Sequence, residues 1–510
     1  MVSLFFLLGL TWAPMPSAAQ AALSASVPYA PSWLARHHLQ LLADQAALPL
    51  PVSHWPLPAA AVQQALDSLP VDTPWADSRR VVQQELHSLL QHGQLGLHLR
   101  SESEAPVGYA ENYSPGNSAT LVTPEWRHGT GGITLAARLG GRVEVNPNSL
   151  QNQFGGPQDE GHYAIRPESS AAVVGWGGWN LQAFSQRYFW GPGWQNSLVN
   201  GSNNPAWTGA GLQRASAAPS ASPWLAWMGP WNFDVFVAKA HDPVVVADQP
   251  SGFLFSGMRL TLKPQPWLEL GLSRGMQTAG AGRPSGVGEF VKAFLGQQTN
   301  KDLGDNFQDS SGQIAGYDVR VNCPKAWGHC AAYTQWMGED SAGNVIPLPF
   351  KFMSLWGLET TTADGQHRLF AEWVDTNAYS LPWNQQASFP GYVNGVYRQG
   401  YTQGARWVAS SFGSGAQVLT LGWLDASQQR LVKVHHGQLA SSLGAYSPGV
   451  PHAPTGRLLG LSVSQTLRWL GMQLSPELAY TQLADGQDQR ASKRQNLRLG
   501  MSIGLPLIPN

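Results

Sequence analysis

The chain has 510 residues, a formal net charge of −1 and only 12% charged residues. This near-neutral balance gives no reason to expect a nucleic acid or a strongly acidic partner. The 55 glycines, the 22 tryptophans and a mean hydropathy of −0.20 fit a β-barrel of alternating residues better than a helical membrane protein.

The only long apolar run lies near the N-terminus, at Val2–Trp12, and it is too short to span a membrane as a helix. The small residues at Ser17–Ala22 resemble a signal-peptidase site, although the usual basic segment before the apolar run is missing. We therefore predict a signal peptide over residues 1–22, and export from the cytoplasm.

Residues 23–92 differ from the rest of the chain because their apolar residues recur at helical spacing. The predicted helices are Pro31–Asp44, Ala59–Leu69 and Asp77–Leu90. Ser32 follows a proline and is a natural N-cap for the first of them. An element of this size is too small to be stable alone, so we expect a periplasmic three-helix element that packs on or in the mouth of a barrel.

From about Leu95 the apolar residues recur at every second position. Leucines alternate with Glu269, Gly271 and Ser273 in one such segment, and apolar residues alternate with Arg498 in another. Apolar-out, polar-in strands of about ten residues indicate a transmembrane β-barrel. A soluble sandwich also alternates, so the prediction depends on the number of strands.

Short and long connections alternate along residues 93–510. Eight short turns and nine long loops require eighteen strands, an even number that places both ends of the barrel in the periplasm. Residues 401–411 also read as a strand, but counting them would break the alternation, so we place them inside the long loop 376–415. The predicted fold is mainly β: a transmembrane antiparallel β-barrel of about eighteen strands with a small N-terminal helical element.

One stretch between two predicted strands combines aromatic and amide side chains. Trp190 and Trp194 bracket a Gly-Pro-Gly turn, and Asn203 and Asn204 belong to the polar run that follows. Flat apolar rings beside neutral amides suit a sugar better than a phosphate or a metal. The alternative is a rigid loop whose tryptophans simply pack.

At this stretch the chain resembles the Wzi capsule-assembly family of Gram-negative outer membranes. The similar segments, in order, are Arg187–Trp194, Ser202–Pro205, Pro223–Phe233, Leu270–Arg274, Gly282–Pro284, Gly316–Arg320, Gly338–Asp340 and Glu372–Thr376. The resemblance extends from about Gly131 to the C-terminus. It implies an outer-membrane barrel of eighteen strands that binds capsular polysaccharide as a lectin, and it does not identify the polysaccharide.

Further candidates for polysaccharide contact lie in the predicted outer loops. Tyr379, Trp383 and Tyr392 are mixed with asparagines and glutamines in the loop 376–415. Rings stack on sugar faces while amides bond hydroxyl groups, although such rings also form interfacial girdles or pack a loop on itself. Arg187, at a strand end, can pair with acidic sugars or with carboxylates inside the barrel.

Cys323 and Cys330 are the only cysteines, and they stand at the two feet of one predicted hairpin. An oxidising compartment would join them, so we predict a disulfide. Free thiols are the alternative, since a metal site would need more soft ligands than these two and His329 supply.

Metal binding and catalysis find little support. The candidate metal ligands are the histidines His37, His38 and His54 and the acidic cluster Asp302, Asp305 and Asp309. The histidines lack a partner at i+4 and are interpreted as surface residues, and the acidic spacing does not reproduce an EF-hand. Glu339, Asp340 and Asp375 could serve a glycosidase, but a barrel rim normally carries such charges. We expect no enzyme activity, no cofactor and no metal.

The sequence therefore predicts a monomeric outer-membrane lectin that binds capsular or exopolysaccharide and assists capsule assembly or attachment. Its expected partners are that polysaccharide, outer-membrane lipid and the capsule export machinery. The alternative is a porin or diffusion channel for oligosaccharides, because eighteen strands enclose an aqueous pore unless helices or loops fill it.

Overall fold

The computed structural model describes residues 25–70, 72–101, 117–130, 132–145, 163–240, 250–295, 311–342, 348–379, 389–404, 406–439, 456–484 and 493–508. The predicted signal peptide and the acidic cluster at 302–309 lie outside these residues. None of the helices within them combines the length and the apolar character that a membrane crossing requires.

The N-terminal element contains the three predicted helices, packed around a core of their own. Its parts are β1 (Pro28–Tyr29), α2 (Trp33–Gln45), β2 (His54–Trp55), β3 (Leu57–Pro58), α3 (Ala59–Asp67), α4 (Ala76–His87) and the π-helical turn η2 (Ser88–His92). The predicted cap of α2 is confirmed, because Oγ of Ser32 accepts a hydrogen bond from the backbone N–H of Ala35 at 3.1 Å. Leu42, Val62 and Leu86 are fully buried between the helices.

Antiparallel strands make up most of the remaining described residues. The strands of the large sheet are β4 (Gln94–Arg100), β5 (Asn117–Val122), β6 (Trp126–Thr130), β7 (Ile133–Arg138), β8 (Gly140–Val145), β9 (Tyr163–Arg166), β10 (Ala171–Trp176), β11 (Trp179–Gln186), β13 (Trp207–Arg214), β14 (Trp231–Lys239), β15 (Leu254–Gln265), β16 (Leu268–Thr278), β17 (Ser311–Asn322), β18 (His329–Ala342), β19 (Leu348–Thr361), β20 (His367–Tyr379), β21 (Phe389–Pro390), β24 (Gln417–Asp425), β25 (Arg430–Leu439), β26 (Gly456–Gln465), β27 (Leu467–Trp469), β28 (Met472–Ala484) and β29 (Lys493–Pro506).

Short elements occupy the connections between these strands. They are β12 (Phe189–Trp190), η4 (Pro223–Met228), α5 (Val287–Phe294), η5 (Lys325–Trp327), β22 (Thr402–Gln403) and β23 (Arg406–Trp407).

The strands of the wall pair in chain order around the molecule, and the last strand, β29, pairs with the first, β4. Three strands continue across a bend: β5 into β6, β7 into β8, and β9 into β10. With these joined, β26 joined to β27, and the two-residue β21 left out, the wall strands of the described residues make the predicted eighteen passes. The hydrogen-bonded ladder is interrupted at the bends, so the sheet is not closed by one unbroken ladder.

The wall alternates between exposed apolar and buried polar side chains, as the sequence predicted. On β29, Leu497 and Leu499 are 59% and 56% exposed, whereas Arg498 between them is 3% exposed. On β16, Leu272 is 40% exposed and Glu269 only 5%. The polar residues therefore face the inside of the barrel, where they need partners.

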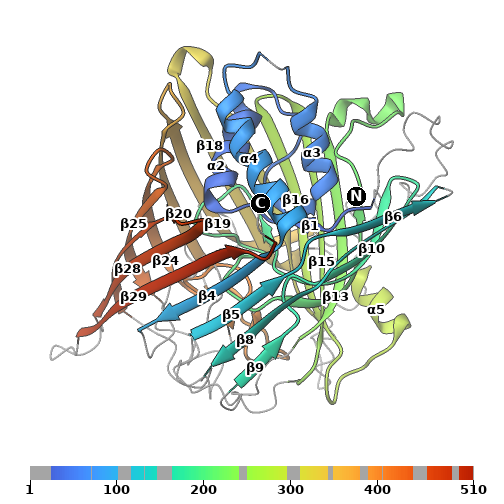
Figure 1. Ribbon diagram of the computed structural model, residues 1–510. Helices are drawn as coiled ribbons and strands as arrows, with labels where there is room; N and C mark the ends of the chain where they lie inside the picture. Colours follow the sequence, from blue (N-terminus) through green and yellow to red (C-terminus); the bar gives the residue numbers. More distant parts are fainter. Residues whose placement is uncertain are drawn as a thin grey trace.

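The helical element lies at the end of the barrel that carries the short turns (Figure 1). Nε2 of His37 lies 2.9 Å from the carbonyl oxygen of Gly365, in the turn between β19 and β20. The ring of Trp75 packs edge-to-face on His329, at the foot of the hairpin of β17 and β18. These contacts confirm that the element packs in a mouth of the barrel.

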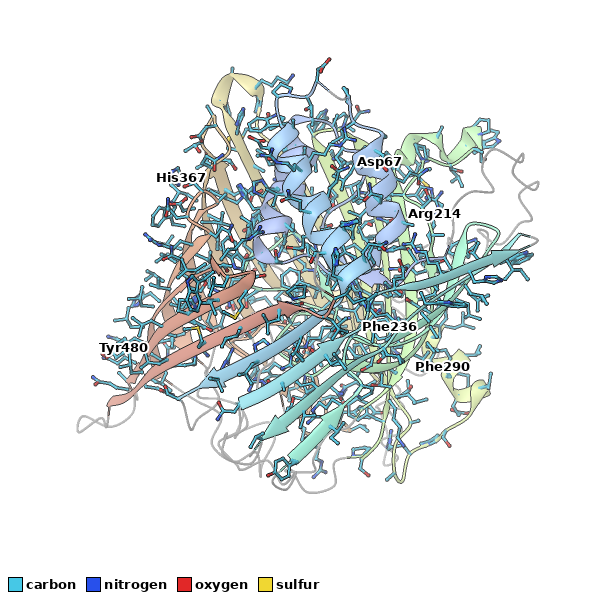
Figure 2. All side chains as sticks on the ribbon, viewed as in Figure 1. Asp67, Arg214, Phe236, Phe290, His367 and Tyr480 are labelled. Carbon is cyan, nitrogen blue, oxygen red and sulfur yellow. A yellow bond between two sulfur atoms is a disulfide. The ribbon has the colours of Figure 1, made fainter. Side chains whose placement is uncertain are left out.

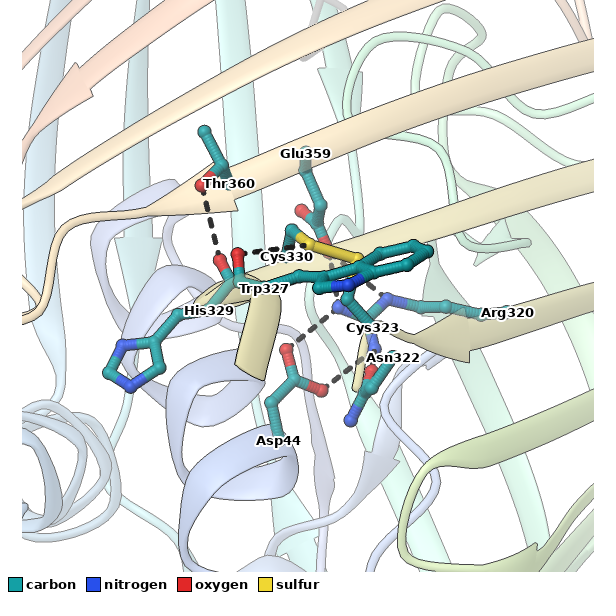
Figure 3. Close-up of a disulfide and its surroundings, with 9 residues drawn as sticks. All are labelled: Asp44, Arg320, Asn322, Cys323, Trp327, His329, Cys330, Glu359 and Thr360. Carbon is teal, nitrogen blue, oxygen red and sulfur yellow. Dashed lines mark hydrogen bonds and ion pairs between the residues drawn. A yellow bond between two sulfur atoms is a disulfide. The ribbon is translucent and has the colours of Figure 1, made fainter. Parts of the chain in front are cut away.

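The predicted disulfide is confirmed at the foot of that hairpin (Figure 3). The Cα atoms of Cys323 and Cys330 lie 5.2 Å apart, and the backbone N–H of Cys323 donates to the carbonyl of Cys330 at 2.8 Å. The bond therefore closes a hairpin whose strands are already paired.

Residues 401–411 lie inside a long connection, as predicted, and not in the wall. β22 and β23 form a small two-stranded sheet of their own, while β20 pairs directly with β24 on the other side of the connection. The strand count is therefore unaffected by this strand-like segment.

Candidate functional site

Two long connections and the helical element pack inside the barrel, where many of their side chains are buried. The first connection, residues 187–206, turns inward directly after β11. Its strand β12 pairs with β2 of the helical element, with Trp190 opposite His54. Trp190 is fully buried, and the backbone N–H of Gly191 donates to the carbonyl of Ser53 at 2.9 Å. This connection is therefore attached to the N-terminal element inside the barrel.

Aromatic rings surround Trp190 on the side of the wall. Tyr188 stacks on Phe236 of β14 with ring centroids 4.2 Å apart, and both rings lie within 6 Å of Trp190. All three side chains are almost completely buried. Such offset and edge-to-face ring packing adds stability beyond the area that it buries, so this cluster holds the start of the connection rigidly.

A carboxylate of the wall holds the next turn of the connection. Glu372 of β20 is completely buried and accepts hydrogen bonds from the backbone N–H groups of Trp194 at 2.7 Å and of Asn196 at 2.8 Å. The side-chain amide of Asn196 adds a third, at 3.1 Å. A Cβ at Gly193 would lie 2.9 Å from Oε2 of Glu372 and even closer to the carbonyl of Asn196. Glycine is therefore required at this position.

A second buried carboxylate joins the wall to helix α2. Glu359 of β19 accepts from Nε1 of Trp194 at 2.5 Å and pairs with Arg320 and with Arg368. Arg320 also binds Asp44 of α2 at 2.7 Å, as the close-up of this region shows (Figure 3). Buried charges are costly unless each finds a partner, so this network fixes the helix relative to the wall.

Arg36 of α2 contributes a cation beside the first inward connection. Its guanidinium donates to the carbonyl of Gly193 at 2.6 Å and lies over the rings of Phe189 and Trp194, with centroid distances of 4.7 and 4.6 Å. Burial lowers the pKa of Arg36 to about 10. The side chain therefore stays charged at neutral pH and binds the inward connection to the helical element.

The second inward connection, between β20 and β24, packs against the first. The backbone N–H of Gly201 donates to the carbonyl of Val408 at 2.7 Å. Nε of Arg406 donates to the carbonyl of Asn203 at 2.9 Å, and its Nη2 to Oδ1 of the same residue at 3.2 Å. A continuous hydrogen-bonded column, called the plug below, therefore runs from the helical element through residues 187–206 to residues 389–416.

The structure places most of the predicted polysaccharide contacts inside the plug. Trp190, Trp194, Asn203, Asn204 and Tyr392 are all at most 9% exposed. A buried side chain offers no surface to a polysaccharide, so for these five residues the structure favours the packing alternative stated above. Their contact with sugar stays a prediction.

The two other described candidates each bind a different carboxylate. Arg187 pairs with Glu168 at 2.5 Å. Tyr379, which is half-buried near the end of β20, donates its hydroxyl to Asp375 at 3.1 Å. Trp383 lies outside the described residues. Of the described candidates, Tyr379 keeps the most accessible ring at a strand end opposite the short turns.

The interpretation of the histidines as surface residues is wrong. His37, His38 and His54 are 0%, 6% and 0% exposed, because α2 and β2 face the barrel wall and the inward connection. Nε of Arg368 donates to Nδ1 of His37 at 3.0 Å. Burial, and next the charge of Arg368, lower the pKa of His37 well below its usual value and that of His38 to about 4. Among the described residues, no group of three or more His, Cys, Asp or Glu is arranged to hold a metal.

Two of the carboxylates considered for glycoside hydrolysis, Asp375 and Glu339, are hydrogen-bonded within the protein. Asp375 accepts hydrogen bonds from the backbone N–H of Asn377 at 2.9 Å and from Nε2 of Gln417 at 2.7 Å. Glu339 accepts from the backbone N–H of Tyr392. Glu339 therefore anchors the second inward connection, and Asp375 links β20 to β24 beside it.

Comparison with known proteins places this architecture in a family. Residues 98–496 match the family described as "Capsule assembly protein Wzi". The chain belongs to this Wzi family. This finding confirms the resemblance recognised in the sequence motifs.

Two relatives show how far the family similarity extends. An uncharacterised 55.8 kDa protein in the cps region of Klebsiella pneumoniae is 28% identical over 333 residues, which are 64% of this chain and 60% of the relative. The structure of Wzi from Escherichia coli, described as an outer membrane protein involved in group 1 capsule assembly and as a carbohydrate-binding β-barrel, matches with a TM-score of 0.72 and 21% identity. That match covers 95% of this chain and 100% of the other. The shared fold is therefore the β-barrel.

Proposed function

We propose that this protein is an outer-membrane β-barrel that binds capsular or exopolysaccharide at the cell surface and assists capsule assembly or attachment, without catalysis. Membership of the Wzi family and the carbohydrate-binding activity of the Escherichia coli protein of the same fold support the proposal. The exposed apolar band of the wall supports a membrane location.

The observation that carries the proposal is the plug. A diffusion channel needs a continuous aqueous path, whereas here Arg36, Glu372 and Arg406 bind the inward connections through hydrogen bonds inside the barrel. The plug supports action at the outer surface rather than transport through the lumen, and it weighs against the porin alternative.

The contact surface belongs to the outer loops in this proposal. Tyr379 and Trp383 supply rings there, and Arg187 supplies a cation near the mouth, while Trp190 and Trp194 support the loops from below. The short-turn end then faces the periplasm, where the helical element is available to the capsule export machinery. We also propose that the protein is exported with a cleaved signal peptide over residues 1–22. We propose further that it is a monomer.

The test is a pair of measurements on the purified full-length protein. In a planar bilayer it should carry no steady ion current, with a porin as the positive control, and it should bind the organism's own surface polysaccharide directly. Tyr379→Ala should weaken that binding severalfold, whereas Tyr480→Ala, on the lipid-facing side of β28, should not. Large steady currents without polysaccharide binding would refute the proposal and favour the channel.

A further inference from the structure

Helix α5, in the connection between β16 and β17, lies outside the barrel and not over its mouth (Figure 1). The carbonyls of Ala293 and Phe294, at its C-terminal end, accept hydrogen bonds from the guanidinium of Arg274 at 3.0 and 2.6 Å. The carbonyl of Ala293 also accepts from Nε2 of Gln313 at 3.0 Å. The helix is therefore attached to two neighbouring strands of the wall.

The two side chains that hold α5 belong to the outward face of their strands. Arg274 shares the face of Leu272 on β16, and Gln313 shares the face of Tyr317 on β17, because side chains at every second position point the same way. Leu272 and Tyr317 are 40% and 41% exposed. The residues at the alternate positions of both strands point into the barrel. α5 is thus attached to the same surface that carries the exposed apolar band.

The helix itself presents an apolar stripe to its surroundings. Val287, Phe290, Val291 and Phe294 follow the spacing i, i+3, i+4, i+7 that places side chains on one face. Val287 is 81% exposed and Val291 is 45% exposed, whereas Ala293 is buried against the wall. Figure 2 shows Phe290 on the outer side of the wall as well. Water is an unfavourable neighbour for such a stripe.

The height of α5 along the wall can be estimated from the strand. Arg274 stands six residues beyond Leu268, the first residue of β16 after its short turn. With a rise of about 3.4 Å per residue and a tilt of about 40°, this separation corresponds to about 15 Å along the barrel axis. The apolar band of such barrels is about 25 Å tall, so α5 is attached within the half of the band farther from the short turns.

We propose that α5 is an amphipathic helix that lies in the plane of the membrane and binds the acyl chains of the outer leaflet. The apolar stripe continues the lipid-facing surface of β16 and β17, which identifies lipid as its partner. The helix also covers Arg274, a charge that would be destabilising on a lipid-facing strand. Its guanidinium is bound by carbonyls at the end of the helix and lies 5.6 Å from the ring centre of Phe294. The inference rests on the membrane location proposed above.

Lipid contact can be measured with a single label on the full-length protein, because both native cysteines are joined in the disulfide. The variant Val287→Cys would carry an environment-sensitive fluorophore in phosphatidylcholine vesicles whose acyl chains bear nitroxide quenchers. Leu272→Cys, on the wall, is the lipid-exposed control. Asp77→Cys, whose native side chain is 84% exposed on the helical element, is the aqueous control.

We expect the label at Val287 to lose as much fluorescence to the lipid quencher as the label at Leu272, and several-fold more than the label at Asp77. Adding Val291→Ser to the labelled variant should reduce this quenching, whereas Lys292→Ser on the polar face should not. If aqueous iodide quenches the Val287 label instead, the proposal for α5 alone is overturned. The same holds if a second copy of the protein shields the label from both quenchers. A Leu272 label that lipid does not quench would overturn the membrane location together with it.

Discussion

The carboxylate of Glu372 binds Asn196 twice, through the backbone N–H at 2.8 Å and through the side-chain amide at 3.1 Å. One residue belongs to the barrel wall and the other to a connection 176 positions earlier in the chain. Because both are buried, this contact helps to hold the first inward connection against the inner face of the wall.

The first prediction concerns this carboxylate. Glu372→Gln keeps the size of the side chain but removes an acceptor from a buried set of backbone donors, which costs about 1–3 kcal/mol for each group left unsatisfied. We expect a lower unfolding temperature in detergent and intermittent ion currents in planar bilayers, where we expect none from the parent protein. Asp77→Asn removes an exposed charge of the helical element and is the control. If Glu372→Gln keeps the unfolding temperature of the parent protein and carries no ion current, then other contacts hold the plug in place.

The second prediction compares two glycines. Gly193→Ala places a Cβ against the carbonyl of Asn196 and the carboxylate of Glu372, so the turn must shift. We expect a destabilisation of about 1–3 kcal/mol from this overpacking. At Gly288 of α5 an added Cβ meets nothing within 4 Å, so Gly288→Ala should be neutral or slightly stabilising. Thermal unfolding of the two variants measures the difference, and equal effects would contradict the assigned turn.

The third prediction concerns pH. His38 has its pKa lowered to about 4 by burial and by the charge of Arg368, while the unfolded chain titrates near 6.5. The unfolded state therefore binds the proton first as the pH falls, and the stability present above pH 6.5 is lost between about 6.5 and 4. For His38 alone the loss is about 2 kcal/mol between pH 7 and pH 5.

This loss is checked by denaturant unfolding at both pH values. His38→Gln, which cannot titrate, should make the dependence on pH less steep by about this amount. An equally steep dependence in His38→Gln would assign the effect to other groups.

The fourth prediction concerns the disulfide. Cys323 and Cys330 are seven positions apart, so the bond constrains only a short loop of the unfolded chain. In the chain-entropy view such a loop contributes about 2–3 kcal/mol. Replacing both cysteines by alanine should lower the stability by that amount without preventing assembly, because β17 and β18 remain paired along their length. Failure of the double variant to reach a folded barrel would give the bond a role in folding.

Much of the fold could be predicted because it depends on local patterns. The cap of Ser32 and the alternation around Glu269 each depend on residues that are close together in the sequence. The exclusion of residues 401–411 from the wall followed from the even number of strands. These predictions are confirmed.

The direction of the long connections could not be predicted in the same way. Contacts with Glu359, Glu372 and Arg36, which are far from it in sequence, hold Trp194 inside the barrel. A tryptophan beside amides looks the same whether it stacks on a sugar or on an arginine. The motifs Gly316–Arg320 and Glu372–Thr376 include two residues of this network. The sequence showed them only as segments similar to a family and did not show which residues they contact. His37 was misjudged for the same reason, since its partner Arg368 lies 331 positions away.

The plug is held in large part by main-chain groups: Gly191 donates to the carbonyl of Ser53, and Gly201 to the carbonyl of Val408. Every residue except proline supplies such a donor. The side chains of the outer loops can therefore vary while the occluded barrel beneath them keeps its shape. A designer could exchange the loop tips between relatives in the same way, provided that the acceptors in the wall are left in place.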